Sequence, residues 1–294
     1  MPFLTVLTPT YNRAHLLPSL YESLCEQSCK DFIWLVIDDG SEDETSSLFS
    51  KWQQEADFEI QYLHKENGGK HRAINYAHPY LKGDLVVIVD SDDQLIPGAV
   101  SRIYMKWLQY REIDPALLIF QRAHLNDSQN AFDKSFPGND HISTLASFIN
   151  RGMSGDHCEV DPVELLKKYL FPDFSGEKFI GEAWLWHHIG QEGPAVFINE
   201  VIYLCEYLEG GLSKSGRAMR LRNPLGGQEH ARVFLHSQYN FRLRFKNAML
   251  YICYGAIAGQ PLRKLVATGE HLPLMLLALI PGLALKCYWE KKYL

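Results

Sequence analysis

Carboxylates, amides and glycines follow four short apolar runs of this sequence, at the points where the runs end. The polar clusters are Thr8–Arg13, Asp38–Ser41, Glu66–Lys70 and Asp90–Asp93. Carboxylates two residues apart, such as Asp90 and Asp92, are hard oxygen ligands that suit Mg²⁺ or Mn²⁺, and an ion held there can bridge a diphosphate. The same acidic turn, ahead of Pro97, is also compatible with simple helix capping. The residue types predict metal-assisted chemistry on a phosphorylated ligand.

The runs that precede these clusters have the composition of buried strands. Candidate strands are Phe3–Thr8, Phe32–Ile37, Glu59–Leu63, Leu85–Val89 and Ala116–Phe120. Helical patterns lie between them at 17–28, 43–55, 70–80 and 97–110. This alternation predicts a parallel α/β sheet, in which ligands bind beyond the carboxyl ends of the strands. We therefore expect the four polar clusters to meet at one edge of the sheet.

Two common nucleotide-binding motifs are absent from the sequence. No G-x-G-x-x-G follows a strand and no G-x-x-x-x-G-K-[ST] occurs, which argues against a dinucleotide-binding oxidoreductase and a P-loop NTPase. Beyond residue 125 the pattern is weaker. Residues 126–155 read as loop-rich with one short helix, 161–171, 181–190 and 228–260 as helical, and 210–216 as a flexible loop.

The charge of the chain is divided between its two ends. The 294 residues are 46% hydrophobic with a net charge of -6, which excludes a disordered chain and argues against a nucleic-acid partner. Residues 1–209 hold 16 Lys and Arg against 32 Asp and Glu, whereas 210–294 hold 13 against 3. The six cysteines form no C-x-x-C pair, a pattern typical of reduced thiols in the cytosol.

The longest uncharged apolar segments, Met249–Leu262 and Leu272–Leu285, lie in the basic part. Each has 14 residues, about 21 Å as a helix, against a hydrocarbon core of roughly 30 Å. Lys and Arg flank both segments, so we expect them to lie in a membrane interface. The alternatives are core helices of a C-terminal lobe or a homodimer contact.

Four strings in order, Thr8-Pro-Thr-Tyr-Asn-Arg, Val36-Ile-Asp-Asp-Gly-Ser, Asn67-Gly-Gly-Lys and Val89-Asp-Ser-Asp-Asp, resemble the family 2 glycosyltransferases with the GT-A fold. The resemblance is strong over residues 3–125 and looser over 126–210. It implies an α/β fold with a mostly parallel central sheet flanked by helices and a helical C-terminal extension. Residues 1–125 would bind the nucleotide-sugar, 126–220 would bind the acceptor and carry the catalytic group, and 221–294 would form a basic, membrane-associating region.

The resemblance also implies which residues bind the nucleotide-sugar. These are Thr8, Pro9, Tyr11, Asp38, Asp39, Asn67, Gly68, Lys70, Asp90 and Ser91. Tyr11 would stack on the base, and Asp39, alone or with Asp38, would accept the imide N–H of uracil, which favours UDP. Asp92 is the expected ligand of Mn²⁺ or Mg²⁺, with Asp90 contributing directly or through a metal-bound water. Asp93 is either a further ligand or a cap.

For the catalytic base the family pattern points to Glu182, in Phe179-Ile-Gly-Glu-Ala-Trp-Leu-Trp. Glu177 and Asp173 are the alternatives. The second acid of the family's usual E-D pair is replaced by Ala183, so a single carboxylate would serve an inverting transfer.

Other polar residues beyond the four strings carry weaker expectations. Asp156 and Glu159 are candidates for sugar binding, and of Trp184 and Trp186 at least one should be core. Lys214 or Arg217 would close a lid at Gly210–Arg217, unless this segment is a solvated linker. His187 and His188 are expected on the surface, and His230 is unassigned.

The resulting expectation is a metal-dependent inverting transferase that moves a sugar from a UDP-sugar to a glycan acceptor. The acceptor would be a lipid-linked polysaccharide precursor at the cytoplasmic face of the plasma membrane. A sugar nucleotidyltransferase and a non-catalytic nucleotide-sugar-binding subunit remain as alternatives.

Overall fold

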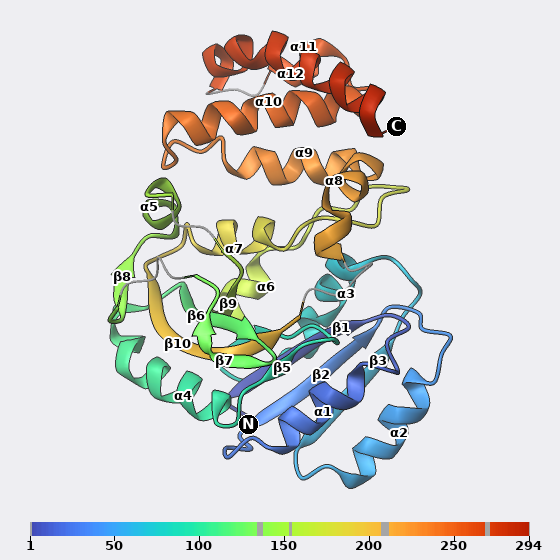
Figure 1. Ribbon diagram of the computed structural model, residues 1–294, viewed down its shortest axis with the longest axis vertical. Helices are drawn as coiled ribbons and strands as arrows, with labels where there is room; N and C mark the ends of the chain where they lie inside the picture. Colours follow the sequence, from blue (N-terminus) through green and yellow to red (C-terminus); the bar gives the residue numbers. More distant parts are fainter. Residues whose placement is uncertain (1, 134–137, 153–154, 207–211, 268–270, 294) are drawn as a thin grey trace.

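The computed structural model describes residues 2–133, 138–152, 155–206, 212–267 and 271–293 (Figure 1). Its strands are β1 (Leu4–Thr10), β2 (Phe32–Asp38), β3 (Glu59–His64), β4 (Leu85–Ile88), β5 (Gln94–Leu95), β6 (Leu117–His124), β7 (Asp127–Ala131), β8 (His141–Ser143), β9 (His157–Pro162) and β10 (Ala195–Cys205). Its α-helices are α1 (Leu17–Cys25), α2 (Thr45–Glu55), α3 (Lys70–Ala77), α4 (Ala99–Tyr110), α5 (Leu145–Asn150), α6 (Val163–Lys168), α7 (Ala183–Ile189), α8 (Leu212–Arg222), α9 (Pro224–Val233), α10 (Phe241–Ile257), α11 (Leu262–Val266) and α12 (Leu272–Tyr293).

One mixed sheet organises the first two thirds of the chain, in the order β3-β2-β1-β4-β9-β6-β10-β5, with β7 beside β6 and β8 beside β10. The strands β1, β2, β3, β4, β6 and β10 all run in the same direction. All five expected strands are present, so the prediction of a mostly parallel sheet is confirmed. The expected helix over 161–171 is partly wrong, because 157–162 form β9, antiparallel to both β4 and β6.

Helices cover both faces of this sheet. Helices α1, α2 and α4 contribute Leu20, Trp52 and Ile103 to the core on one face, and α3, α6 and α7 contribute to the core on the other. Every residue of β1 and β2 is buried. This two-sided cover explains why these strands read as nearly continuous apolar runs, and it leaves the sheet edge as the place for polar side chains.

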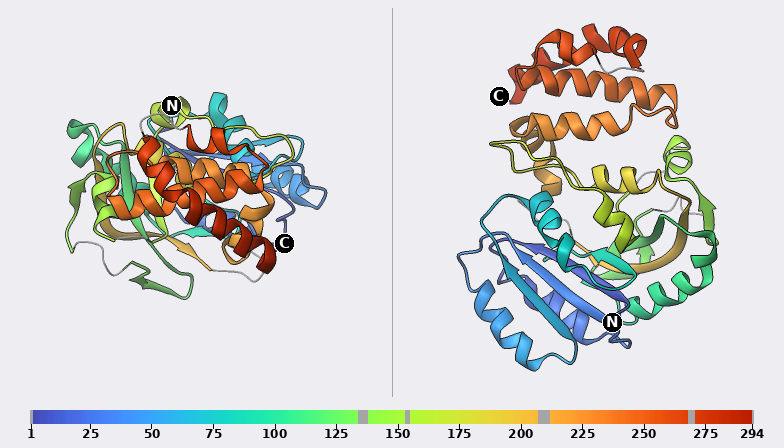
Figure 2. Two further views of the ribbon diagram at one scale, coloured as in Figure 1. Left: turned by 90° about the horizontal axis from the view of Figure 1, so that it is seen from above. Right: turned by 180° about the vertical axis from the view of Figure 1, so that it is seen from behind.

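The C-terminal helices form a separate layered stack above the sheet, seen in both side views (Figures 1 and 2). Helix α10 lies between α9 and α12, and its residues Ala248 and Tyr251–Gly255 are buried. At Gly282 an added Cβ would lie 2.9 Å from Ile252 Cβ, so this glycine lets α12 approach α10 closely. Residues 251–255 of the segment Met249–Leu262 are therefore core, one of the alternatives left open by the sequence, whereas its end at Leu262 is exposed.

Two further expectations for this region need correction. Residues 212–216 of the expected flexible loop belong to helix α8, while Gly210 and Gly211 lie outside the described residues. The expected helical stretch over 228–260 consists of two helices, α9 and α10, which are joined by a turn. Leu221 at the end of α8 packs with Tyr254 and Trp289, so α8 belongs with the C-terminal stack.

Candidate active site

The polar clusters meet at the carboxyl edge of the sheet, around a cavity of about 770 Å³. Its lining includes Pro9, Thr10, Tyr11, Arg13, Asp39, Asn67, Lys70, Asp90, Ser91, Asp92, Asp93, Arg122, Asp156, Glu159, Lys178, Glu182, Trp186 and His187. The far wall is formed by Met219, Asn223 and Phe234, at the ends of α8 and α9. The cavity therefore lies between the sheet and the helical stack. This is the edge of the sheet at which we expected a ligand from the sequence.

Asp90, Asp92 and Asp93 converge in the turn after β4. Their carboxylate oxygens lie within 4.8 Å of one another. The Tyr203 hydroxyl, from β10, accepts from the Asp90 amide at 3.0 Å and donates to the Asp93 carboxylate at 2.6 Å. This Tyr203 contact fixes the shape of the turn.

The electrostatics of the turn fit a divalent cation. Burial and the Asp90 charge raise the pKa of Asp92, and the same two causes raise the pKa of Asp93 to about 7. Clustered carboxylates that resist ionisation together are relieved by a cation among them, and oxygen-only donors suit Mg²⁺ or Mn²⁺. The donor set thus matches the metal expected from the sequence.

Lys70 connects this turn to Glu182. Its ammonium lies 2.9 Å from the Glu182 carboxylate and also forms an ion pair with Asp90. Burial alone would lower the pKa of Lys70, but the two carboxylates outweigh it and raise that pKa. Burial raises the pKa of Glu182 even though the Lys70 charge opposes the change. Glu182 is thus a half-buried carboxylate at the cavity wall, paired there with Lys70.

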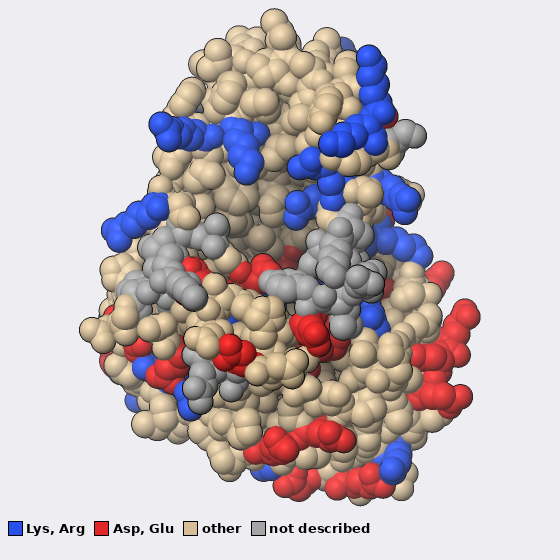
Figure 3. Space-filling view, in the orientation of Figure 1, with Lys and Arg blue, Asp and Glu red and all other residues tan. Residues whose placement is uncertain are grey.

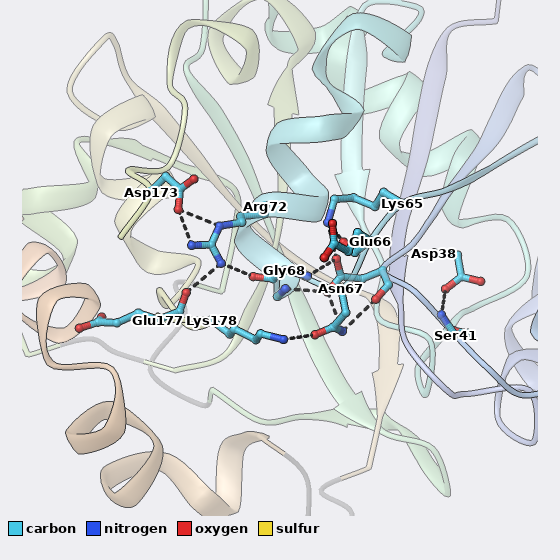
Figure 4. A network of polar contacts seen from close by, with 12 residues as sticks. Asp38, Ser41, Lys65, Glu66, Asn67, Gly68, Arg72, Asp173, Glu177 and Lys178 are labelled. Atoms are coloured by element: carbon cyan, nitrogen blue, oxygen red, sulfur yellow. Dashed lines mark hydrogen bonds and ion pairs between the residues drawn. The ribbon is translucent and has the colours of Figure 1, made fainter. Parts of the chain in front are cut away.

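The two alternatives for the base are engaged elsewhere, and Figure 4 shows Asp173 with its partner Arg72. The Glu177 carboxylate accepts from the Leu225 and Gly226 amides, both at 2.8 Å, at the first turn of α9. Asp173 accepts from Arg72 Nε at 2.8 Å and is 71% exposed. Glu177 thus joins the segment before α7 to α9, Asp173 pairs with Arg72 on α3, and neither carboxylate lines the cavity.

Of the four residues Thr8–Tyr11 at the end of β1, three line the cavity and one does not. Tyr11 is 47% exposed at the cavity lip, beside Pro9 and Thr10. Thr8 is fully buried and accepts from the Trp34 indole N–H at 3.0 Å, so it lies outside the cavity lining.

The two aspartates at the end of β2 also differ in whether they line the cavity. Asp38 is fully buried, accepts from the Ser41 amide at 2.8 Å and from the Tyr62 hydroxyl, and does not line the cavity. Asp39 does line it. Its Oδ1 accepts from Lys65 at 2.6 Å and from the Gly68 amide at 2.9 Å. Asp38 thus shapes the turn, and Asp39 connects the turn to the loop before α3.

That loop is held between Asp39 and Lys178 (Figure 4). The Gly69 amide donates to Asp39 at 2.6 Å, and the Asn67 side chain accepts from Lys178 at 2.7 Å. Gly69 has φ +97°, and an added Cβ would lie 2.1 Å from the Lys178 carbonyl oxygen. Glycine is therefore required here, and its close approach aims Lys70 into the cavity.

Arg122, at the end of β6, was missed by the sequence reasoning. Its guanidinium lies 4.1 Å from the centre of the Tyr203 ring, and its Nε donates to the His157 carbonyl at 2.5 Å. Burial alone would lower the pKa of Arg122, but its electrostatic interactions with surrounding groups, Tyr203, Glu159 and Asp90 among them, outweigh burial and raise that pKa. A charged residue closing an apolar run was the signal that could have identified it.

The remaining candidates divide between the cavity and the core. Asp156 and Glu159 both line the cavity, and burial raises the pKa of Glu159 to about 8 although Arg122 opposes the shift. Trp186 lines the cavity, whereas Trp184 packs against Phe171 in the core, as their alternation on α7 predicts.

Three other expectations are corrected or redirected. His187 was expected on the surface but is buried, 2.7 Å from the Tyr239 hydroxyl, and lines the cavity. Arg217 lies 5.0 Å from the centre of the Trp289 ring on α12, and it does not line the cavity. The Lys214 side chain lies outside the described residues, so the expected lid has no described cation over the cavity.

Comparisons with known proteins agree with this fold. Residues 5–150 match the family model described as Glycosyl transferase family 2. The chain is 31% identical over 199 residues to the GalNAc(5)-diNAcBac-PP-undecaprenol beta-1,3-glucosyltransferase of Campylobacter jejuni. The match covers 65% of this chain and 61% of that protein. The chain thus spans about three fifths of that relative's length.

Two solved structures share the architecture over nearly the whole chain. Staphylococcus aureus TarS 1–349 in complex with UDP-GlcNAc has a TM-score of 0.66 and 18% identity, covering 95% of this chain and 80% of that one. The mannosyltransferase PcManGT of Pyrobaculum calidifontis, in complex with GDP-Man and Mn²⁺, has a TM-score of 0.58 and 22% identity, covering 99% and 88%. These likenesses confirm the GT-A fold expected from the sequence.

Proposed function

Because this chain belongs to the family 2 glycosyltransferases, we propose that it transfers a sugar from a UDP-sugar to a hydroxyl of a lipid-linked glycan, with inversion and with a divalent metal. The observation that carries the proposal is the joint placement of Lys70, Asp90 and Glu182 in one cavity. A candidate base on α7 and a candidate metal site after β4 face the same space. A donor diphosphate and an acceptor hydroxyl can both be held there.

Glu182 is the proposed general base. It takes the proton of the acceptor hydroxyl while that oxygen forms a bond to the anomeric carbon of the donor sugar. The bond from the anomeric carbon to the diphosphate oxygen breaks on the opposite side, and its electron pair leaves with UDP. One carboxylate is sufficient for this single displacement, so Ala183 in place of a second acid presents no obstacle.

Lys70 and Arg122 give the cavity positive charge close to the proposed diphosphate site. Lys70 also fixes the Glu182 carboxylate through its 2.9 Å contact, so it is a positioning residue for the base. Asp90, Asp92 and Asp93 would hold Mn²⁺ or Mg²⁺, which stabilises negative charge on the departing diphosphate when it is bound. Glu182, positioned by Lys70, thus acts on the attacking hydroxyl, and the aspartate cluster with Arg122 acts on the leaving diphosphate.

The proposed donor is a UDP-sugar. Tyr11 offers an exposed ring at the cavity lip for a base to stack on, and Asp39 lies beside it as an acceptor for the uracil imide N–H. Both Asp39 oxygens already accept from protein donors, so we expect the Lys65 contact to yield when the base binds. The TarS structure with UDP-GlcNAc supports this choice, and PcManGT with GDP-Man makes GDP-sugars the comparison to include.

The proposed acceptor is a lipid-linked glycan at the cytoplasmic face of the membrane. The Campylobacter relative is named for a substrate that carries sugars on undecaprenyl diphosphate. The excess of acidic residues in 1–209 disfavours nucleic acid as a partner. A glycan that hangs from a membrane lipid fits a cavity bounded by a basic helical stack.

Neither alternative function has comparable support. A sugar nucleotidyltransferase needs a glycine-rich triphosphate loop near the N-terminus, and Thr8–Arg13 holds no glycine. A non-catalytic binding subunit needs no base, yet Glu182 faces the cavity with a raised pKa while Glu177 and Asp173 are engaged elsewhere.

The test is a donor and acceptor screen that measures nucleotide release, followed by mass analysis of the product. We expect release of UDP only with a UDP-sugar, a glycan acceptor and Mn²⁺ or Mg²⁺, and loss of turnover on chelation. Binding of UDP and Mn²⁺ without turnover on any lipid-linked glycan would favour the non-catalytic alternative.

A further inference from the structure

Helix α12 is apolar on both of its long faces. The inner face packs against α10 through Met275, Ala278 and Trp289, which are buried. The outer face exposes Leu276 by 56%, Leu277 by 57% and Ile280 by 79%. A helix that is hydrophobic all round normally has apolar surroundings on every side. The outer face therefore needs an apolar partner that the described chain does not supply.

The exposed surface extends beyond this one helix. Leu262 on α11, Phe241 on α10 and Leu272 at the start of α12 are 51%, 61% and 46% exposed. We define the outer apolar face as Phe241, Leu262, Leu272, Leu276, Leu277 and Ile280. The space-filling view shows the top of the molecule, over α11 and α12, as largely free of charged side chains (Figure 3).

Basic side chains border this apolar surface. The exposed cations of helices α10, α11 and α12 are Arg242, Lys246, Arg263, Lys264, Lys291 and Lys292. In the described part of 212–293 the carboxylates are Glu229 and Glu290, paired with Arg232 and Lys286 on their own helices. Figure 3 shows most of the blue side chains in the upper half, below the uncharged top, and the red ones from the middle of the molecule to its lower end.

We propose that the outer apolar face inserts into the surface of an anionic bilayer, with the surrounding Lys and Arg on the lipid phosphates and the sheet facing the cytosol. This inference rests on the proposed function only for its biological setting. Apolar side chains on one side and cations at their margin are the pattern of a helix lying in a membrane interface. The acidic end of the molecule then points away from the lipid charge, so the whole charge distribution favours this orientation.

Charge also decides between a bilayer and a second copy of the chain. In a two-fold dimer the same surface meets itself, so the basic border of one copy would face the basic border of the other. Anionic lipid instead supplies the opposite charge. Helix α12 is also long and apolar enough to cross a membrane by length and composition, with a mean hydropathy of 1.6. Its inner face is already packed on α10, however, which favours lying in the interface over crossing.

The experiment is flotation of the full 294-residue chain with vesicles of phosphatidylcholine alone or with 40% phosphatidylglycerol. We expect binding to the anionic vesicles only, weakened by high salt. The double substitution Leu276→Glu and Ile280→Glu should lower the partition coefficient at least tenfold, which corresponds to about 1.4 kcal/mol. The matched control is Met105→Glu, because Met105 is 63% exposed on α4, outside the helical stack. Serines at 276 and 280 replace the glutamates if that variant does not fold.

Several results would overturn the proposal. These are absence of binding to anionic vesicles, equal binding to neutral vesicles, and equal losses in the Met105→Glu control. The proposal would also be overturned if the chain sedimented as a dimer without vesicles and the substitutions at 276 and 280 dissociated that dimer. Calorimetric UDP binding separates this test from the proposed function. Vesicle binding without nucleotide binding contradicts the proposed function alone, and nucleotide binding without vesicle binding contradicts this surface alone.

Discussion

Replacing Glu177 by glutamine should destabilise the fold and leave the chemistry intact. Both Glu177 oxygens accept backbone amides at 2.8 Å at the start of α9, and the side chain is buried. Glutamine offers one acceptor and turns an N–H₂ group toward a donor, so one buried amide loses its partner at a cost of about 1–3 kcal/mol. Losing a negative charge at a helix N-terminus adds about 0.3–1 kcal/mol.

The combined loss of about 1–4 kcal/mol should lower Tm by roughly 2–7 °C for a chain of this size. Thermal unfolding, monitored by circular dichroism, measures this change in Tm. Turnover measured well below Tm should stay within about twofold of the parent. The matched variant is Glu182→Gln, in which we expect the reverse: Tm little changed and turnover strongly reduced. Unchanged Tm with a large loss of turnover in Glu177→Gln would refute the assignment of these two glutamates.

Three further substitutions test other parts of the site. Burial, with the Glu182 charge adding to it, raises the pKa of Asp161 to about 8, so the folded chain binds this proton at a pH where the unfolded chain does not. Stability should therefore fall between about pH 4 and pH 8 by up to about 1.4 kcal/mol per pH unit from this group, and denaturant titrations of Asp161→Asn should lack that contribution. Gly69→Ala should lose stability and UDP affinity in melting and calorimetry, because of its φ and its clash with Lys178, while Gly176→Ala, whose added Cβ meets nothing within 4 Å, should lose only about 1 kcal/mol. Asp92→Asn should raise the Mn²⁺ concentration for half-maximal turnover at least tenfold, and an unchanged metal requirement would remove Asp92 from the ligand set.

The sheet and its polar edge could be predicted from sequence because buried parallel strands have a local signature. Val and Ile runs followed at once by polar residues locate β1, β2 and β4 and put Asp90, Lys70 and Asp39 at one edge. The family pattern for the base, matched to the stretch 179–186, then points to Glu182, and the structure places it 2.9 Å from Lys70.

What the sequence could not resolve was decided by tertiary contacts. Asp38 and Asp39 are neighbours of one type, yet only Asp39 lines the cavity, since Asp38 turns to Ser41 and Tyr62. Strand β9 was missed because Glu159 and Asp161 interrupt its apolar pattern, and these carboxylates are buried only by elements distant in the sequence. Glu177 and Glu182 could be separated only once α9 was in place.

The most direct test of Glu182 as the general base compares the parent and Glu182→Gln in two assays on one preparation of each. One assay is calorimetric binding of UDP with Mn²⁺, and the other is kcat for UDP release with the donor and acceptor found in the screen. We predict unchanged UDP affinity within about twofold and a fall in kcat of about 10²–10⁴, the usual contribution of a general base. A variant that retains the parent kcat would contradict the assignment of Glu182 and with it the proposed mechanism.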